Sequence, residues 1–277
     1  MKAAHFEYAA PKTLPEACVL LASNGAETAA IAGGQSLLPM LSLRVALPKL
    51  VVDIGGLDEL KGIRATADGL WIGALTTHAA IEDGAVPGSI GRFMQKVAST
   101  ISYRTVRNHG TIGGSVALAD PAADWPGCLI ALGACVRIAG LKGSHSQPVA
   151  EFVQGQYSTS LAPDEIVVGF DLPPTEIALR WGFFKVVRKS GAFANSIAYA
   201  VSRGQGEPAT VVLAAAGDRP CLLPTVAEWI DEGESTEESL LAAISKNVAT
   251  HVTPDDSYLM RLHTSTVLRA VREMQNQ

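Results

Sequence analysis

Short apolar runs alternate with segments of helical periodicity along the first 174 residues of the chain. Apolar runs bounded by glycine, asparagine or aspartate indicate buried strands, whereas apolar positions three and four residues apart indicate helices. These patterns predict strands over residues 28–32, 50–54, 70–74, 135–139 and 165–172. They predict helices over residues 14–23, 77–82, 90–99 and 124–132.

The pattern changes after Pro173-Pro174, because proline can extend neither a helix nor a strand. Three strands joined by glycine-containing turns are predicted over residues 180–188, 196–202 and 209–215. Helices are predicted to follow over residues 225–231, 237–248 and 255–275. We therefore predict one domain over residues 1–174, with subdomains of about 1–56 and 57–174, and a second domain over residues 175–277.

Two glycine pairs each follow an apolar or small residue and lead into a small hydroxyl residue. The first lies in Ala32-Gly33-Gly34-Gln35-Ser36-Leu37 and the second in Thr111-Ile112-Gly113-Gly114-Ser115. Glycine permits a sharp turn, and successive exposed N–H groups form a concave nest that suits phosphate oxygens. The hydroxyls of Ser36, Thr111 and Ser115 would add donors. Two such loops predict two walls of one diphosphate site, although a single Gly-Gly pair more often marks an ordinary turn.

The composition argues against several classes of protein. The net charge of the 277 residues is −5 and no lysine-arginine cluster occurs, so we expect no nucleic-acid partner. The four cysteines are scattered, whereas an iron–sulfur cluster needs grouped thiolates. No apolar signal core follows Met1-Lys2 and no run of ~18 apolar residues occurs, so we expect a cytoplasmic protein without a membrane span.

Common catalytic motifs are absent as well. The sequence contains neither Gly-x-x-x-x-Gly-Lys-Ser/Thr nor Gly-x-Gly-x-x-Gly, which argues against a P-loop and against a Rossmann dinucleotide site. Its six histidines show no metal-ligand spacing, so we expect no metal on this chain. Two phosphate nests with few candidate catalytic side chains suit a protein whose reactive group is a cofactor.

Four segments, over residues 32–41, 110–115, 120–124 and 188–191, together resemble one family in motif, order and spacing. It is the FAD-binding (medium) subunit of the molybdenum hydroxylase, or xanthine dehydrogenase, family, to which the medium subunit of carbon monoxide dehydrogenase belongs. The resemblance covers nearly the whole chain. It implies an α+β fold, with a two-subdomain FAD-binding domain of the PCMH/VAO type followed by a small domain of three-stranded antiparallel sheet plus helices.

The resemblance also implies roles for individual residues. The two glycine loops would wrap the FAD diphosphate, and Asp124 would contact ribityl or ribose hydroxyls. Lys185 would lie near the pyrimidine end of the isoalloxazine ring, and Phe193 beside that ring. The simpler alternatives are a helix cap for Asp124, a solvated strand-edge lysine for Lys185 and a core phenylalanine for Phe193. Arg107, which matches an Ile-Arg-Asn pattern of the family, would either neutralise phosphate or form a structural ion pair.

One position departs from the family pattern, because Ala192 stands where an acidic residue is usual. The family implies an oxidoreductase subunit that takes electrons from [2Fe-2S] clusters on a small partner chain and passes them to an external acceptor. A large partner chain with a molybdenum cofactor would oxidise the substrate, and the expected assembly is (αβγ)2. Two alternatives stay open: a self-sufficient FAD oxidoreductase of the same fold, and a non-catalytic scaffold that has lost flavin.

Overall fold

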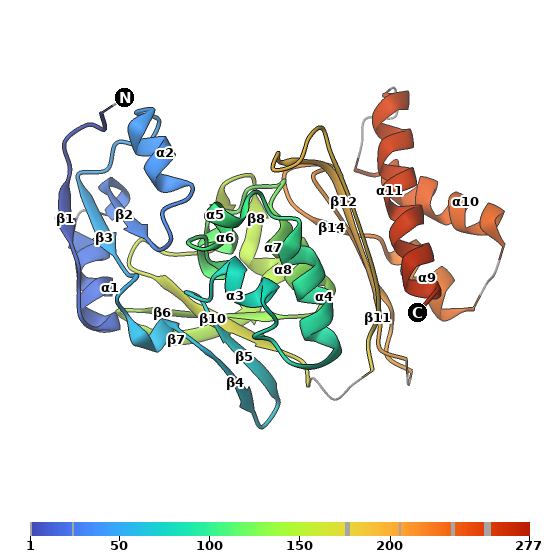
Figure 1. Cartoon of the computed structure of the whole chain (residues 1–277), viewed down its shortest axis with the longest axis horizontal. Coiled ribbons are helices and arrows are strands. Elements are labelled where there is room, and N and C mark those ends of the chain that lie inside the picture. The colour runs from blue at the N-terminus through green and yellow to red at the C-terminus, as the bar shows by residue number, and fades with distance from the viewer. Residues whose placement is uncertain (1, 24, 175–177, 205, 234–235, 252–255) are drawn as a thin grey trace.

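The computed structural model describes residues 2–23, 25–174, 178–204, 206–233, 236–251 and 256–277. Figure 1 shows three regions that follow one another in chain order along the long axis of the molecule. A small N-terminal region is drawn in blue, a central region in cyan to yellow, and a C-terminal region in orange and red.

The N-terminal region is a small sheet covered by a helix. Its elements are β1 (Glu7–Ala9), α1 (Leu14–Ser23), β2 (Thr28–Ile31), α2 (Leu37–Ser42) and β3 (Leu50–Asp53), with short 3-10 helices at Gly25–Glu27 and Asp58–Leu60. The strand order is β1-β3-β2, and both pairs are parallel. Helix α1 buries Ala17, Cys18 and Leu21 in the same apolar cluster as Leu50 and Val52 of β3.

The central region is an antiparallel sheet with helices packed against it. Its strands are β4 (Ile63–Thr66), β5 (Gly69–Gly73), β6 (Cys135–Gly140), β7 (Gly143–Pro148) and β10 (Ile166–Leu172), in the order β4-β5-β10-β6-β7. Its helices are α3 (His78–Glu82), α4 (Gly88–Ser99), α5 (Arg104–Arg107), α6 (Ile112–Leu118), α7 (Asp124–Ala131) and α8 (Val149–Phe152). A separate two-stranded ribbon joins β8 (Val153–Gly155) to β9 (Ser158–Thr159).

The C-terminal region is an antiparallel sheet followed by three helices. Its strands are β11 (Arg180–Val187), β12 (Ala194–Ser202), β13 (Thr210–Ala214) and β14 (Cys221–Leu222), paired in that order. Its helices are α9 (Pro224–Asp231), α10 (Glu237–Val248) and α11 (Ser257–Gln275). The three predicted strands are present, but the prediction of a three-stranded sheet is corrected by β14. This two-residue strand escapes pattern analysis because it lies in a short stretch between Pro220 and Pro224.

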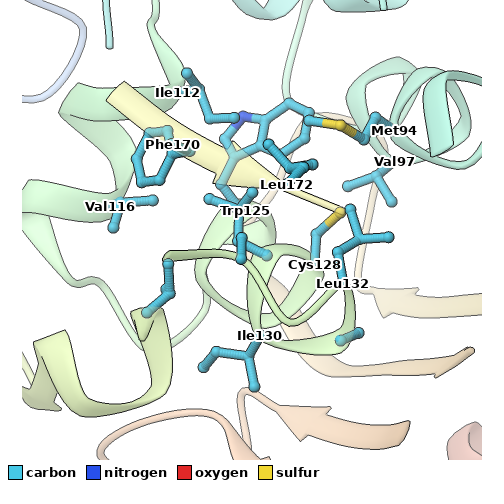
Figure 2. Packing of buried hydrophobic residues seen from close by; sticks show 14 of the residues in the cluster. Met94, Val97, Ile112, Val116, Trp125, Cys128, Ile130, Leu132, Phe170 and Leu172 are labelled. Carbon is cyan, nitrogen blue, oxygen red and sulfur yellow. The ribbon is translucent and has the colours of Figure 1, made fainter. Parts of the chain in front are cut away.

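Helix α7 joins the central region to the C-terminal sheet. Figure 2 shows Trp125 of α7 among Ile112 and Val116 of α6 and Phe170 of β10. On the C-terminal side, a Cβ at Gly127 of α7 would lie 2.5 Å from the ring of Tyr199 in β12, so only glycine permits this approach. The opposite face of the C-terminal sheet packs against α9, α10 and α11, so this sheet is buried on both faces.

The predicted α+β organisation is confirmed, with most element boundaries within two residues of their predicted positions. Helices α2 and α6 were not predicted, because α6 contains a glycine pair that was interpreted as loop and α2 begins three residues after the other pair. Strand β7 was missed because its side chains are polar and mostly exposed, so it lacks an apolar run. The predicted helix start at Asp255 and residues 175–177 at the predicted domain boundary lie outside the described residues, and the domain division stays a prediction.

Within the described ranges, no helix is both long and apolar enough to cross a membrane. In the same part of the chain, no group of three or more histidine, cysteine, aspartate and glutamate side chains is arranged to hold a metal ion. All four cysteines are free thiols.

Candidate functional site

A cavity of about 520 Å³ lies where the three regions meet. Its walls come from the loop after β2, the N-terminal ends of α6 and α7, strand β11 and the loop between β11 and β12. Every residue predicted for the site except Ile112 lines this cavity. Ile112 is instead fully buried in the core beside Trp125 (Figure 2), so its side chain contributes packing rather than cavity surface.

The first glycine loop presents a row of unused backbone donors. Among the described residues, the N–H groups of residues 33–37 donate to no protein acceptor. The loop is held instead by the Gln35 side chain, which donates to the Gly33 carbonyl at 3.0 Å, and by the Leu38 N–H, which donates to the Gly34 carbonyl at 3.0 Å. Gly34 has a φ of +70°, a conformation that favours glycine. This loop therefore retains the anion-binding capacity predicted from the sequence.

The second glycine loop differs, because four of its five N–H groups, those of residues 112–115, already donate within the protein. Thr111 caps α6 by accepting a hydrogen bond from the Gly114 N–H at 3.1 Å, and the Ser115 N–H donates to the Thr111 carbonyl at 3.1 Å. The N–H groups of Ile112 and Gly113 donate to carbonyls of Thr76 and Ala74 at 3.0 and 2.9 Å. The predicted nest of free N–H groups is therefore wrong for this loop. A threonine three residues before Gly114 is a helix-capping signal that sequence reasoning could have used.

The glycines of the second loop serve close packing. A Cβ at Gly113 would lie 2.5 Å from the Cβ of Ala74, the residue that follows β5. The two glycine loops also approach each other, since a Cβ at Gly33 would lie 1.8 Å from the carbonyl oxygen of His109. Gly33 and Gly113 are thus required by contacts within the protein as well as by any ligand.

Asp124 and Lys185 form a buried ion pair beside the cavity. Lys185 Nζ lies 2.8 Å from Asp124 Oδ2, and the two side chains are only 6% and 7% exposed. Lys185 also donates to the Thr100 carbonyl at 3.3 Å. Asp124 is not the cap of α7, because Ala123 holds that position. Both simpler alternatives are therefore wrong: Asp124 caps no helix, and Lys185 is not solvated.

The second oxygen of Asp124 is unused. Oδ1 is buried and has no hydrogen-bond partner within the described part of the chain. Burial raises the pKa of this carboxyl, and the charge of Lys185 opposes the shift. A buried acceptor without a donor costs free energy, so Oδ1 is suited to a hydroxyl or amide group supplied by a ligand.

The structure decides between the two roles predicted for Phe193 and between the two predicted for Arg107. Phe193 is 70% exposed and lines the cavity, so it is not a core residue. Arg107 is buried, with its guanidinium donating to Glu82 at 2.7 and 2.8 Å and to the carbonyls of Ile101 and Ser102 at 2.8 and 3.1 Å. Its role is therefore the structural ion pair.

His78 lines the cavity and was not selected from the sequence. Its Nδ1 accepts a hydrogen bond from the Trp125 indole at 2.9 Å. Because an indole N–H can only donate, the proton of the neutral imidazole is on Nε2. Burial, with a smaller contribution from Arg107, lowers the pKa of His78 to about 4. A histidine within an apolar stretch gives no sequence signal for such a contact, since Trp125 is 47 residues away.

We expect this buried neutral histidine to make stability depend on pH. The unfolded chain takes up a proton near the ordinary pKa of 6.5, but the folded chain does so only near 4. The contribution of neutral His78 to stability is therefore fully present above pH 7 and is lost as the pH drops toward 4. Between pH 7 and pH 5 the share of His78 is about 2 kcal/mol. Urea unfolding at pH 7 and pH 5 should show that the loss of stability between these pH values is smaller by this amount in His78→Gln. His145→Gln, at a half-exposed histidine, should leave that loss unchanged.

Comparison with known proteins identifies the family. The family described as the FAD binding domain in molybdopterin dehydrogenase matches residues 4–175. The chain belongs to this family. A glyceraldehyde dehydrogenase medium chain from Sulfolobus acidocaldarius is 33% identical over 256 residues, which are 91% of this chain and 90% of that one. A carbon monoxide dehydrogenase medium chain from Hydrogenophaga pseudoflava is 35% identical over 73% of this chain and 70% of its own length.

Solved structures agree with this assignment to the family of FAD-binding subunits. Carbon monoxide dehydrogenase from Hydrogenophaga pseudoflava matches with a TM-score of 0.91 and 29% identity, covering 100% of this chain and 99% of that one. Quinoline 2-oxidoreductase from Pseudomonas putida 86 matches with a TM-score of 0.87 and 30% identity over the same shares. The resemblance, the fold class and the assignment as an FAD-binding oxidoreductase subunit are thereby confirmed.

Proposed function

We propose that the cavity binds FAD with its diphosphate against residues 33–37 and its sugar hydroxyls near Asp124. The observation that carries this proposal is a match of unused groups around one cavity: free N–H donors on one wall and the buried Oδ1 of Asp124 on another. A diphosphate accepts hydrogen bonds, whereas ribityl and ribose hydroxyls also donate them. The two unused sets of groups therefore fit the two kinds of polar group in FAD.

In this proposal the second loop forms a wall instead of a nest. Gly114 lines the cavity without a side chain, so a ligand can come close to its backbone. The hydroxyls of Thr111 and Ser115 line the same wall and can donate to a ligand oxygen. The sequence similarity of the two glycine loops thus covers two different roles, with the first loop carrying most of the interaction with the phosphates.

The remaining predicted residues orient the cofactor. Lys185 balances the charge of Asp124, so that Oδ1 can accept a hydrogen bond without an unpaired charge in a buried site. Phe193 presents an apolar ring at the cavity, where it suits contact with a planar ring system and restricts water. Because Ala192 also lines the cavity, no carboxylate is added at this point.

Bound FAD would supply the redox chemistry, linking [2Fe-2S] clusters on a small partner chain to an external acceptor. We assign substrate oxidation to a molybdenum cofactor on a large partner chain, in an (αβγ)2 complex. Names of related proteins support a role within a complex, because they include a medium chain and a subunit beta of dehydrogenases. The four free cysteines, dispersed over the chain, support placing the clusters on another chain, and they suit the reducing cytoplasm.

The visible absorption spectrum of the tagged chain, purified from its native host with its copurifying chains identified, tests this proposal. We expect flavin absorbance together with iron–sulfur absorbance, one smaller partner and one larger partner. Flavin without partners would favour the self-sufficient oxidoreductase. A folded chain without flavin would overturn FAD binding and leave the scaffold alternative.

A further inference from the structure

The loop between β11 and β12 carries three residues of the cavity wall but has little support of its own. Gly191, Ala192 and Phe193 all line the cavity. Within the loop, the Ala192 N–H donates to the Lys189 carbonyl at 3.1 Å. Among the hydrogen bonds of the described residues, one reaches residues 188–193 from outside this hairpin, and it comes from Tyr103.

Tyr103 makes two contacts with this loop. Its hydroxyl donates to the Ser190 carbonyl at 3.1 Å. Its ring lies against Gly191, where a Cβ would be 2.5 Å from the ring Cζ. Gly191 has a φ of +81°, so both its backbone conformation and the ring above it require glycine. The Tyr103 side chain is nevertheless more than half exposed, so its contacts are not ordinary core packing.

The backbone that carries Tyr103 is firmly held. Tyr103 occupies the N-cap position of α5, the helix that ends at Arg107. Arg104 pairs with Asp83 and Glu82 at 2.6 and 2.8 Å, and Arg107 binds Glu82 and two carbonyls just before Tyr103. These contacts fix α5 to α3 of the central region. Tyr103 therefore connects a rigid support to a weakly supported loop.

We propose that Tyr103 is a positioning residue that fixes the β11–β12 loop over the cavity, so that Phe193 covers the isoalloxazine ring of bound FAD. This inference rests on the proposed binding of FAD. Tyr103 does not line the cavity and need not touch the cofactor. Its effect passes through Gly191 and Ser190 to Phe193, two positions further along the loop. A loop held in its binding conformation loses less entropy when a ligand binds, so it retains the ligand longer.

The test is the rate of FAD release from the purified complex, together with iodide quenching of the bound flavin's fluorescence. Tyr103→Phe removes the hydrogen bond to Ser190 but keeps the ring, and we expect release roughly fivefold faster, as for one net hydrogen bond. Tyr103→Ala removes both contacts, and we expect release more than about tenfold faster with clearly stronger quenching. The matched control is Tyr258→Ala, which removes a similarly exposed tyrosine from α11 and should change neither quantity.

A double-mutant cycle with Phe193→Ala separates positioning from general stabilisation. If Tyr103 acts through Phe193, adding Tyr103→Ala to Phe193→Ala should accelerate release by less than about twofold. Fully additive effects would overturn the inference, as would unchanged release and quenching in Tyr103→Ala. A wild-type chain that binds no FAD would instead overturn the proposed function itself, so the two failures are distinguishable. If Tyr103→Ala does not fold, the same cycle is run with Tyr103→Phe, which should accelerate FAD release in the wild-type chain but not in Phe193→Ala.

Discussion

Replacing Lys185 with methionine is expected to lower the free energy of unfolding by about 3 kcal/mol at pH 8. Lys185 Nζ lies 2.8 Å from Asp124 Oδ2, and both side chains are less than a tenth exposed. Without the ammonium group, the Asp124 carboxylate would be buried and unpaired, since its Oδ1 already lacks a partner. Urea unfolding of the full chain measures the loss.

The loss from Lys185→Met should depend on pH. Burial already raises the pKa of Asp124, and removal of the opposing lysine raises it further. A carboxyl whose pKa is raised by folding favours the folded state at low pH, and that contribution disappears as the pH rises through the folded pKa. The free energy of unfolding of the variant should therefore be closest to that of the wild type at acidic pH and furthest below it at alkaline pH.

Two further variants control this experiment. Lys49→Met removes an exposed pair with Glu27, also at 2.8 Å, and should cost under about 1 kcal/mol. Adding Asp124→Asn to Lys185→Met removes the stranded charge and should recover most of the stability. Equal losses of stability from Lys49→Met and Lys185→Met would show that burial of the Lys185–Asp124 pair has no energetic consequence.

Gly33→Ala is expected to abolish most FAD binding, raising the dissociation constant roughly 100-fold, equivalent to about 3 kcal/mol. The new Cβ would lie 1.8 Å from the His109 carbonyl oxygen, and a backbone atom cannot turn aside as a side chain can. The first loop would have to move away from the second, taking its free N–H groups out of position. Equilibrium titration of the apo chain with FAD measures the change.

Gly56→Ala is the matched control for Gly33→Ala. Gly56 also belongs to a Gly-Gly pair in the N-terminal region, but nothing lies within 4 Å of a Cβ built there. Its FAD affinity should stay within about twofold of wild type. Wild-type affinity in Gly33→Ala would mean that the first loop does not hold the phosphates, and the anion-binding role assigned to residues 33–37 would then be wrong.

The sequence predicted the order of elements well, because apolar runs and helical periodicity reflect burial directly. It also selected residues that line one cavity, although Ile112 belongs to the core. The sequence could not show whether the N–H groups of the two glycine loops form hydrogen bonds within the protein. That depends on Ala74 and Thr76, which the fold brings beside the second loop, whereas no carbonyl of the described residues accepts from the N–H groups of the first. The local sequence specified a turn in both places, and tertiary contacts decided in which loop the N–H groups stay free to bind a ligand.

Burial of charged groups was equally hard to predict. Lys185 stands in a strand where alternation would allow a solvent-facing side chain, and its partner lies 61 residues earlier. The same is true of His78, whose tautomer is set by Trp125 of α7 and whose pKa is lowered mainly by burial. Ion pairs and tautomers depend on distances that no local pattern encodes. Phe193 shows the converse case, in which an apolar residue is exposed because it belongs to a cavity wall.

The cavity takes its walls from all three regions of the chain, with residues 33–37 from the first, Asp124 from the second and Lys185 from the third. A nascent chain leaving the ribosome therefore has no complete cavity until the strand that contains Lys185 has been synthesised and has docked on α7. Under the proposed binding of FAD, cofactor uptake would therefore follow synthesis of residues 1–193, the last of which lines the cavity. A chain that carries FAD would already have brought residues of all three regions together, so loading would mark subunits ready for assembly.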